Sequence, residues 1–336
     1  MREPYIAPSR RSITDFEKEY FVINTLAETV TVMNGENTDE IYPDVITTGM
    51  WPNACHFHRG NLYIVNSGDN TITVYDESTF EYIGEIYIGS GSNPWMIIPK
   101  PGTDTAFVPC FASGDLAEIN LVSMTVENRT ELGNGPEGGV FQDGKVYVGN
   151  TAWNYQLFDF DEGTVSAVDG ETGELLTTIT VEINPQSILP FPDIHEIHVV
   201  CTGKNGGPGS DDGKVVVINT LTDTVTHTID TGGSPVGGIG GIDSTANTVY
   251  LTGVGGIMSY NFITKTIING SDNYLLEGTD REGDLFSGLA VDEEARRLYV
   301  CFFTGDSIIG INLEDNTIVK EIEGSDGPQS IYLYTE

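Results

Sequence analysis

Positive charge is scarce in this sequence. Its 336 residues include 15 lysines and arginines against 50 aspartates and glutamates, which gives a formal net charge of −35 at pH 7. Such a surface repels nucleic-acid phosphates and anionic lipid headgroups, so we expect no nucleic-acid partner and no direct membrane insertion. The acidity has two open explanations, which are solubility in a salty or crowded setting and a surface that binds cations.

Cysteine is also rare, with four widely separated residues: Cys55, Cys110, Cys201 and Cys301. The CxxC pairs that usually supply a structural zinc site are missing. The internal repeat of the chain places the last three in alternate repeats, too far apart for the ~4.4–6.8 Å Cα separation of a disulfide. We therefore expect neither disulfides nor a structural zinc ion.

Long apolar runs and common catalytic motifs are missing as well. The longest apolar stretches, such as Ser187–Pro192 and Leu298–Phe303, fall far short of the roughly 18–20 residues of a membrane span. No GxSxG elbow, Walker loop or HExxH occurs. The first residues, 1–15, lack the apolar core of an intact secretory signal, and we interpret them as an N-terminal extension before a single domain at 16–336.

Glycine and aromatic residues are abundant, with 40 glycines, 15 tyrosines and 14 phenylalanines. This composition is typical of short strands joined by tight turns. One unit recurs along the chain and is clearest at residues 49–88, where a turn precedes four short segments with period-2 alternation. A turn proline marks the copies, at Pro52, Pro94, Pro136, Pro185, Pro235 and Pro328.

The two ends of the chain complement each other. The domain opens on a second-strand sequence, YFVINTLAETVTVMN, and closes on a turn and first strand, GSDGPQSIYLY. Joined, they complete a seventh repeat, whereas an open solenoid would leave the split repeat unexplained. The sequence thus predicts an all-β, seven-bladed β-propeller of four-stranded antiparallel blades, closed by N- and C-terminal segments that share one blade.

The segments LYIVNSGDNTITVYDESTFEYIGEI and GKVVVINTLTDTVTHTIDTGGSPVGGIGGIDSTANTVYLTG resemble the YVTN-repeat β-propellers. The pattern of that family is roughly a YVxN strand, an NTVxVID strand and then a GxxPxG turn. The resemblance covers nearly the whole chain from about Glu17 onward. It implies an extracytoplasmic bacterial or archaeal protein, in the periplasm, on the cell surface or secreted, and it leaves the activity open.

One face of the propeller is the candidate for function. Strand alternation places the turns before the inner strands on the same face as the turns between second and third strands. Two of the latter are enlarged, at residues 151–163 and 202–213, and long loops on a regular scaffold often bind ligands. The candidate ligand-binding residues on this face are Trp51, Asn53, Trp95, Glu137, Trp153, Tyr155, Gln186 and Gln329. For Trp51 and Trp95, packing over a neighbouring blade is the competing interpretation.

Metal sites have weaker support. His56 and His58 share one strand face and could ligate a metal if a third ligand came from a neighbouring blade, although packing between blades is the favoured interpretation. The acidic turns at residues 159–162 and 211–212 could hold Ca²⁺, but neither has the spacing of a known calcium loop. The sequence therefore predicts no cofactor, with calcium as the alternative.

These observations favour a non-catalytic binding module that uses this face for a small molecule, a glycan or a partner protein. Two alternatives remain. A metal-dependent propeller enzyme of the lactonase or lyase kind would need carboxylates or histidines converging on the central channel. A structural surface-layer component would need flat lateral contacts and no occupied pocket.

Overall fold

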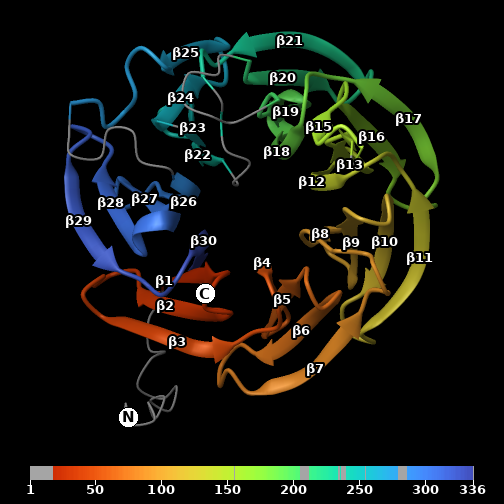
Figure 1. The fold of residues 1–336 in the computed structure, drawn as a ribbon, viewed down its shortest axis with the longest axis horizontal. Helices are drawn as coiled ribbons and strands as arrows, with labels where there is room; N and C mark the ends of the chain where they lie inside the picture. The colour runs from red at the N-terminus through yellow and green to blue at the C-terminus, as the bar shows by residue number, and fades with distance from the viewer. Residues whose placement is uncertain are drawn as a thin grey trace.

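The computed structural model describes residues 18–154, 156–204, 212–233, 235, 240–253, 255–278 and 286–335. The predicted extension at 1–15 and the candidate Tyr155 therefore lie outside the described residues. The described chain forms seven four-stranded antiparallel sheets arranged around a central axis, which confirms the predicted seven-bladed β-propeller (Figure 1). In the described segments no helix is long and apolar enough to cross a membrane.

Each blade runs from an inner strand at the channel to an outer strand at the rim. Blade 1 comprises, in that order, β30 (Pro328–Thr335), β1 (Lys18–Asn24), β2 (Thr29–Asn34) and β3 (Ile41–Thr47). Blade 2 comprises β4 (Pro52–His58), β5 (Asn61–Asn66), β6 (Thr71–Asp76) and β7 (Tyr82–Tyr87). Blade 3 comprises β8 (Ile98–Pro99), β9 (Thr105–Cys110), β10 (Asp115–Asn120) and β11 (Thr125–Glu131). Blade 4 comprises β12 (Pro136–Gln142), β13 (Lys145–Asn150), β16 (Thr164–Asp169) and β17 (Leu175–Thr180).

The remaining blades follow the same order. Blade 5 comprises β18 (Pro185–Phe191), β19 (Glu196–Cys201), β20 (Lys214–Asn219) and β21 (Thr224–Asp230). Blade 6 comprises β22 (Gly241–Asp243), β23 (Thr248–Gly253), β24 (Gly256–Asn261) and β25 (Thr266–Asn269). Blade 7 comprises β26 (Phe286–Asp292), β27 (Arg297–Phe302), β28 (Ser307–Asn312) and β29 (Ile318–Glu323). Single-turn 3₁₀ helices follow β18 and β27, as η2 (Pro192–Ile194) and η3 (Phe303–Gly305).

The ring closes in blade 1. β30, from the end of the chain, pairs antiparallel with β1, from its beginning, over the register Lys18↔Thr335 to Asn24↔Pro328. This pairing joins the two ends of the chain in one sheet, as predicted, and gives β1 a hydrogen-bonded neighbour on both sides.

The hydrophobic core lies between the blades. Among the described residues it divides into seven clusters, each built from two neighbouring blades, so that the layers continue around the whole ring. The second strands are buried on both faces, for example β5, in which every residue after Asn61 is buried. The outer strands, such as β7, are mostly exposed. Burial on both faces explains why a second strand such as β5 has a nearly continuous apolar run.

The recurrent asparagines and threonines have a structural role. Asn150, the last residue of β13, donates from Nδ2 to Thr164 at 3.0 Å and to Ser166 at 2.9 Å on the neighbouring strand. Asn24 and Asn66 make the equivalent bonds in blades 1 and 2. These side chains fix the turn from second to third strand on the face that carries the candidate site.

A second repeated feature, an Asx turn, lies at the opposite end of the blades. The third strand of every blade ends in Asn or Asp, and this side chain accepts hydrogen bonds from residues two or three positions further on. In blade 5, Asn219 Oδ1 accepts the N–H groups of Leu221 and Thr222, both at 3.1 Å. Such Asx turns explain why the repeat ends this strand with a short polar side chain.

Candidate functional site: the central cavity

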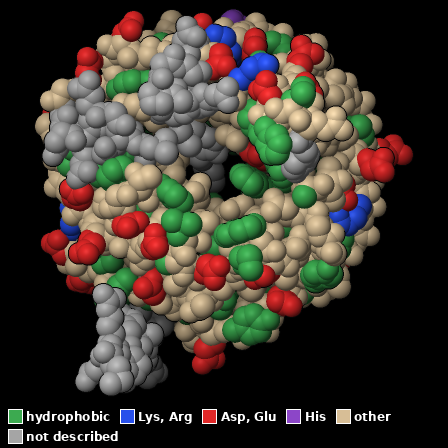
Figure 2. Space-filling view, in the orientation of Figure 1, with side chains coloured by type: hydrophobic (Ala, Val, Ile, Leu, Met, Phe, Trp, Pro, Cys, Tyr) green, Lys and Arg blue, Asp and Glu red, His purple; other side chains and the backbone are tan. Residues whose placement is uncertain are grey.

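A cavity of about 220 Å³ lies at the centre of the ring. Its lining comes from β4, β12, β18, β30 and the segment that leads into β8. The lining residues are Asn53, Ala54, Trp95, Met96, Gly138, Gly139, Gln186, Ser187, Ile188, Gln329, Ser330 and Tyr332. Figure 2 shows this end of the channel as a hollow, with hydrophobic side chains beside it and acidic side chains spread over the surrounding face.

A bulge in the inner strands shapes this cavity. In β4 the ladder steps from Pro52 to Ala54, which leaves Asn53 as the extra residue, and β18 does the same at Gln186. β30 pairs with β1 through Pro328 and then Ser330, so Gln329 is the extra residue there. A bulge re-aims side chains, and in these strands it brings two consecutive residues after the proline into the lining of the cavity.

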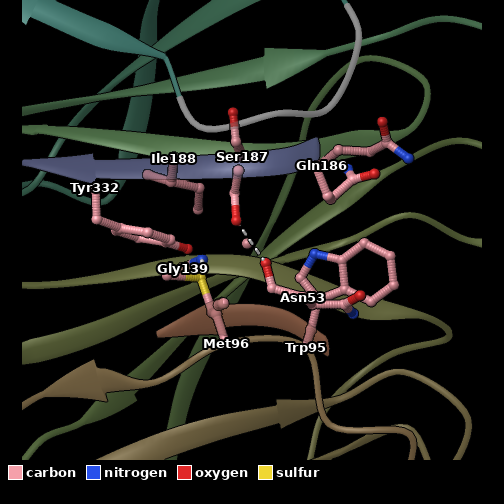
Figure 3. A pocket seen from close by; sticks show the side chains of 12 residues that line it. Asn53, Trp95, Met96, Gly139, Gln186, Ser187, Ile188 and Tyr332 are labelled. Atoms are coloured by element: carbon pink, nitrogen blue, oxygen red, sulfur yellow. Dashed lines mark hydrogen bonds between the residues drawn. The ribbon is translucent and has the colours of Figure 1, made fainter. Parts of the chain in front are cut away.

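The cavity has a polar end and an apolar end. Figure 3 shows Asn53, Trp95 and Gln186 together at one side, whereas Ile188 and Tyr332 lie at the other side with Met96 between them. Asn53 also donates a hydrogen bond to Ser67 Oγ, and the ring of Trp95 lies 6.0 Å from that of Phe111. These contacts hold the two side chains at the rim of the cavity.

Glu137 is buried next to two residues that line the cavity. It occupies the same bulge position in β12 that Asn53, Gln186 and Gln329 occupy in their strands, and the next two residues, Gly138 and Gly139, line the cavity. The side chain is 3% exposed, and Oε2 has no hydrogen-bond partner among the described residues. Burial raises the pKa of this carboxyl group to about 8, so it is mostly protonated at pH 7 in the empty protein.

The sequence-predicted candidates divide into three groups. Asn53, Trp95, Gln186 and Gln329 meet in the cavity lining. Glu137 is buried and is not among the lining residues, although the two residues that follow it are. Trp51 and Trp153 lie outside the lining; Trp51 is 55% exposed in the turn before β4.

The inserted segment 151–163 forms a small hairpin between β13 and β16. Its strands are β14 (Trp153–Asn154) and β15 (Asp159–Phe160). The ring of Trp153 packs against Phe160 at 4.8 Å and Phe158 at 6.3 Å. Leu157 and Phe158 at the tip are 68% and 78% exposed. The second insertion, at 202–213, is described only in part, and its Lys204 forms an ion pair with Asp159 of the hairpin at 3.2 Å.

Several lining residues were not predicted. Ser187 and Ser330 lie one position beyond the bulge residues, Tyr332 lies three positions beyond Gln329, and Met96 follows Trp95. If Gln186 and Gln329 face the channel, strict period-2 alternation predicts that Ser187 and Ser330 face away from it. A predicted bulge after each turn proline would have identified them, because it brings both consecutive side chains to the same side.

The possible metal ligands do not gather in groups of three among the described residues. The rings of His56 and His58 stack at 6.4 Å, and His58 Nε2 contacts Asp104 of the next blade at 2.9 Å, which confirms packing between blades for His58. Of the acidic turns, Asp161 accepts a hydrogen bond from Asn154, and Asp211 is outside the described residues. In the parts of the chain that the structure describes, no three His, Cys, Asp or Glu residues are close enough to hold a metal ion.

The four cysteines are free and buried. Cys110, Cys201 and Cys301 lie in the second strands of blades 3, 5 and 7, as predicted, at the last position or next to it. Burial raises the pKa of each thiol, to about 12 for Cys110, so thiolates are scarce at neutral pH.

Solved structures share this fold at very low sequence identity. A functionally unknown protein from Desulfotomaculum acetoxidans matches with a TM-score of 0.72 and 12% identity, over 94% of this chain and 99% of that one. Hydrazine synthase from Kuenenia stuttgartiensis matches with a TM-score of 0.64 and 13% identity, over 82% and 92%. The computationally designed Ika8 protein matches with a TM-score of 0.63 and 12% identity, over 90% and 84%.

At these identities the likeness concerns the fold alone. No protein-family model matches the sequence, and no curated protein does. The comparisons and the geometry together show a seven-bladed β-propeller, a fold that suits a binding or interaction module.

Proposed function

We propose that the chain is a binding module that takes a small polar organic ligand in its central cavity. The observation that carries this proposal is the convergence of Asn53, Trp95, Gln186 and Gln329, from four different blades, on one cavity. Ligand sites typically combine an apolar lining with a few placed polar groups, and this lining has that composition.

The size and polarity of the cavity define the ligand. A cavity of 150 Å³ holds benzene, so about 220 Å³ suits roughly nine non-hydrogen atoms. The three amide side chains can each donate and accept hydrogen bonds, whereas Met96, Ile188 and Tyr332 offer an apolar surface. A molecule with one polar end and a short apolar body meets both requirements.

Thermal unfolding against a panel of sugars, amino acids, amines, carboxylates and Ca²⁺ tests this proposal. A ligand at 100 times its Kd stabilises the folded state by about 2.7 kcal/mol, which is a shift of several degrees in a chain of this size. We expect an organic ligand to raise the unfolding midpoint of the wild type and of Trp51→Ala equally, because Trp51 is outside the lining. The same ligand should leave the unfolding midpoint of Trp95→Ala unchanged. A panel without effect on the wild type, or an effect that persists in Trp95→Ala, would contradict a cavity ligand.

A second candidate function is docking of a protein partner on the hairpin at 151–163. The exposure of Leu157 and Phe158 at its tip favours this candidate, since adjacent exposed large apolar side chains mark interaction sites. A photo-crosslinking phenylalanine at position 158 tests it in the cells that make the protein. A discrete adduct is expected at position 158 and not at the control position Tyr82, which is 58% exposed on β7; the same adducts at both positions would refute it.

We further propose that the chain is a YVTN-repeat protein that acts outside the cytoplasm. The Asn150 bonds to Thr164 and Ser166, and their equivalents in blades 1 and 2, support the first part, because they give the repeated Asn and Thr positions a common role. Fractionation of the source cells, followed by detection of the chain in periplasmic, surface and cytoplasmic fractions, tests the second part. Recovery in the cytoplasmic fraction alone would overturn it.

A further inference from the structure

Three side-chain amides line the central cavity, and their chemistry narrows the ligand class. Asn53, Gln186 and Gln329 come from blades 2, 5 and 1, and each is the extra residue at the bulge of its inner strand. Figure 3 shows Asn53 and Gln186 on the side of the cavity where the indole ring of Trp95 lies. A ligand on this side therefore meets amide groups that are far apart in the chain.

Most hydrogen-bonding groups of these amides are available to a ligand. Asn53 uses Nδ2 for its bond to Ser67 Oγ, which leaves its carbonyl oxygen as an acceptor. The side chains of Gln186 and Gln329 form no hydrogen bond with the residues that the structure describes. Each glutamine amide has two N–H donors and an acceptor oxygen. The cavity thus presents donors and acceptors together.

The described lining carries no charge. All the residues that line the cavity are of uncharged types. Glu137, buried next to Gly138 of the lining, has a pKa raised to about 8 by burial, so it is mostly neutral at pH 7. An ion that entered the cavity would lose its hydration without gaining an opposite charge, which is costly. The described lining therefore favours an uncharged ligand.

A carboxamide matches these groups without a charge. A primary carboxamide has two N–H donors and an acceptor oxygen, so it can exchange a pair of N–H···O bonds with the Gln186 amide and donate to the Asn53 oxygen. The apolar side, formed by Met96, Ile188 and Tyr332, suits an aromatic or short hydrocarbon body. A sugar ring would place hydroxyl groups against this apolar side, where they would lack partners.

We propose that the cavity selects uncharged carboxamides with a small apolar body, with the amide against Gln186 and Asn53 and the body toward Ile188 and Tyr332. This inference rests on the proposed binding function and adds selection against charge. The selection comes from desolvation. The lining offers hydrogen bonds to an amide, and it offers no opposite charge to a carboxylate or a cation.

Calorimetric titration of the wild type at pH 7 with benzamide, benzoate and benzamidine tests this selectivity. The three probes match in size and shape and differ in charge, since benzamide is neutral, benzoate is an anion and benzamidine is a cation. We expect benzamide to bind about tenfold or more tightly than either ion, because an unpaired charge costs more to desolvate than an amide. Equal or tighter binding of either ion would overturn the inference.

The variant Gln186→Glu should reverse the preference. A carboxylate at this position can accept two parallel N–H bonds from an amidinium group, as carboxylates do from arginine. Benzamidine should therefore bind this variant about tenfold or more tightly than benzamide. Asn128→Asp, which adds the same charge at an exposed position on β11, is the control and should keep the preference of the wild type. Reversal in both variants, or in neither, would show that Gln186 does not contact the amide.

The outcomes separate this inference from the function on which it rests. Equal binding of the neutral and charged probes overturns the inference and leaves a cavity ligand in place. Failure of all three probes also overturns the inference, and the panel used for the proposed function, which contains uncharged sugars, then decides that function. The comparison of the three probes on the wild type keeps the test decisive even if Gln186→Glu folds poorly.

Discussion

At the scale of single residues, burial rather than sequence context sets the chemistry of the site. Glu137 stands in the turn sequence GPEGG, and the sequence identified it as a candidate from its position alone. The sequence could not predict the protonation state of this carboxyl group, because its pKa depends on the packing of blades that are far apart in the chain. In the structure the side chain is 3% exposed, and one carboxyl oxygen has no hydrogen-bond partner among the described residues.

The buried carboxyl group predicts a specific dependence of stability on pH. Its pKa is about 8 in the folded protein against an ordinary value near 4.5, so the folded protein keeps a proton that the unfolded chain releases in this window. The free energy of unfolding should therefore fall as the pH rises from about 5 to 8, by up to about 1.4 kcal/mol per pH unit from this group. Glu137→Gln should remove this contribution.

Urea unfolding of the ligand-free protein at pH 5.5, 6.5 and 7.5 measures the effect. Relative to Glu137→Gln, the wild type should lose roughly 1 kcal/mol per pH unit. Glu174→Gln, a change at an exposed position on blade 4, serves as the control and should follow the wild type. Parallel profiles for the wild type and Glu137→Gln would show that Glu137 is ionised in the folded state.

At the scale of elements, the sequence predicted the strands well and the cavity lining in part. The turn prolines located the inner strands, and Asn53, Gln186 and Gln329, which the sequence placed near the channel mouth, line the cavity. Ser187 and Ser330 were missed because the bulge breaks the period-2 rule on which the assignment relied. A bulge depends on hydrogen-bond register with the next strand, which the alternation of side chains does not encode.

The asparagine that ends β13 makes a prediction about blade stability. The buried Asn150 donates to Thr164 and Ser166 on the neighbouring strand. Its replacement by alanine leaves two hydroxyl groups with one accepted bond fewer each, and should cost about 1–3 kcal/mol of unfolding free energy. A double-mutant cycle with Ser166→Ala isolates the contribution of one bond. Additive effects in the cycle would show that the bond contributes nothing to stability.

At the scale of the whole molecule, the split seventh repeat in the sequence already predicted a closed ring. An open and a closed repeat array have the same local pattern, and only the incomplete repeats at the two ends distinguish them. The structure pairs β1 with β30 and completes seven interblade layers, one of which joins blade 7 to blade 1. There, Tyr20 donates to Asp292 at 2.7 Å, which adds a polar contact to the closure.

Removal of β30 should open the ring. Deletion of residues 328–336 leaves β1 as an unpaired edge and removes the buried Ile331 from the layer between blades 7 and 1. We expect a large drop in the unfolding midpoint and association of the truncated chain in size-exclusion chromatography. A circular permutant supplies the control: it joins the ends through a flexible linker and opens the chain at the exposed turn 77–79. This permutant should remain monomeric, and a stable, monomeric truncated chain would contradict the importance of closure.

The most direct measurement of a ligand in the central cavity uses Trp95 as the reporter. The variant Trp51→Phe/Trp153→Phe leaves Trp95 as the one tryptophan, and the replaced residues lie outside the cavity lining. Its fluorescence is followed while a ligand that raises the unfolding midpoint is titrated. Occupation of the cavity predicts a saturable change in the Trp95 emission with the same Kd that calorimetry gives. An unchanged emission for a ligand that stabilises the protein would place the binding site elsewhere and contradict the account.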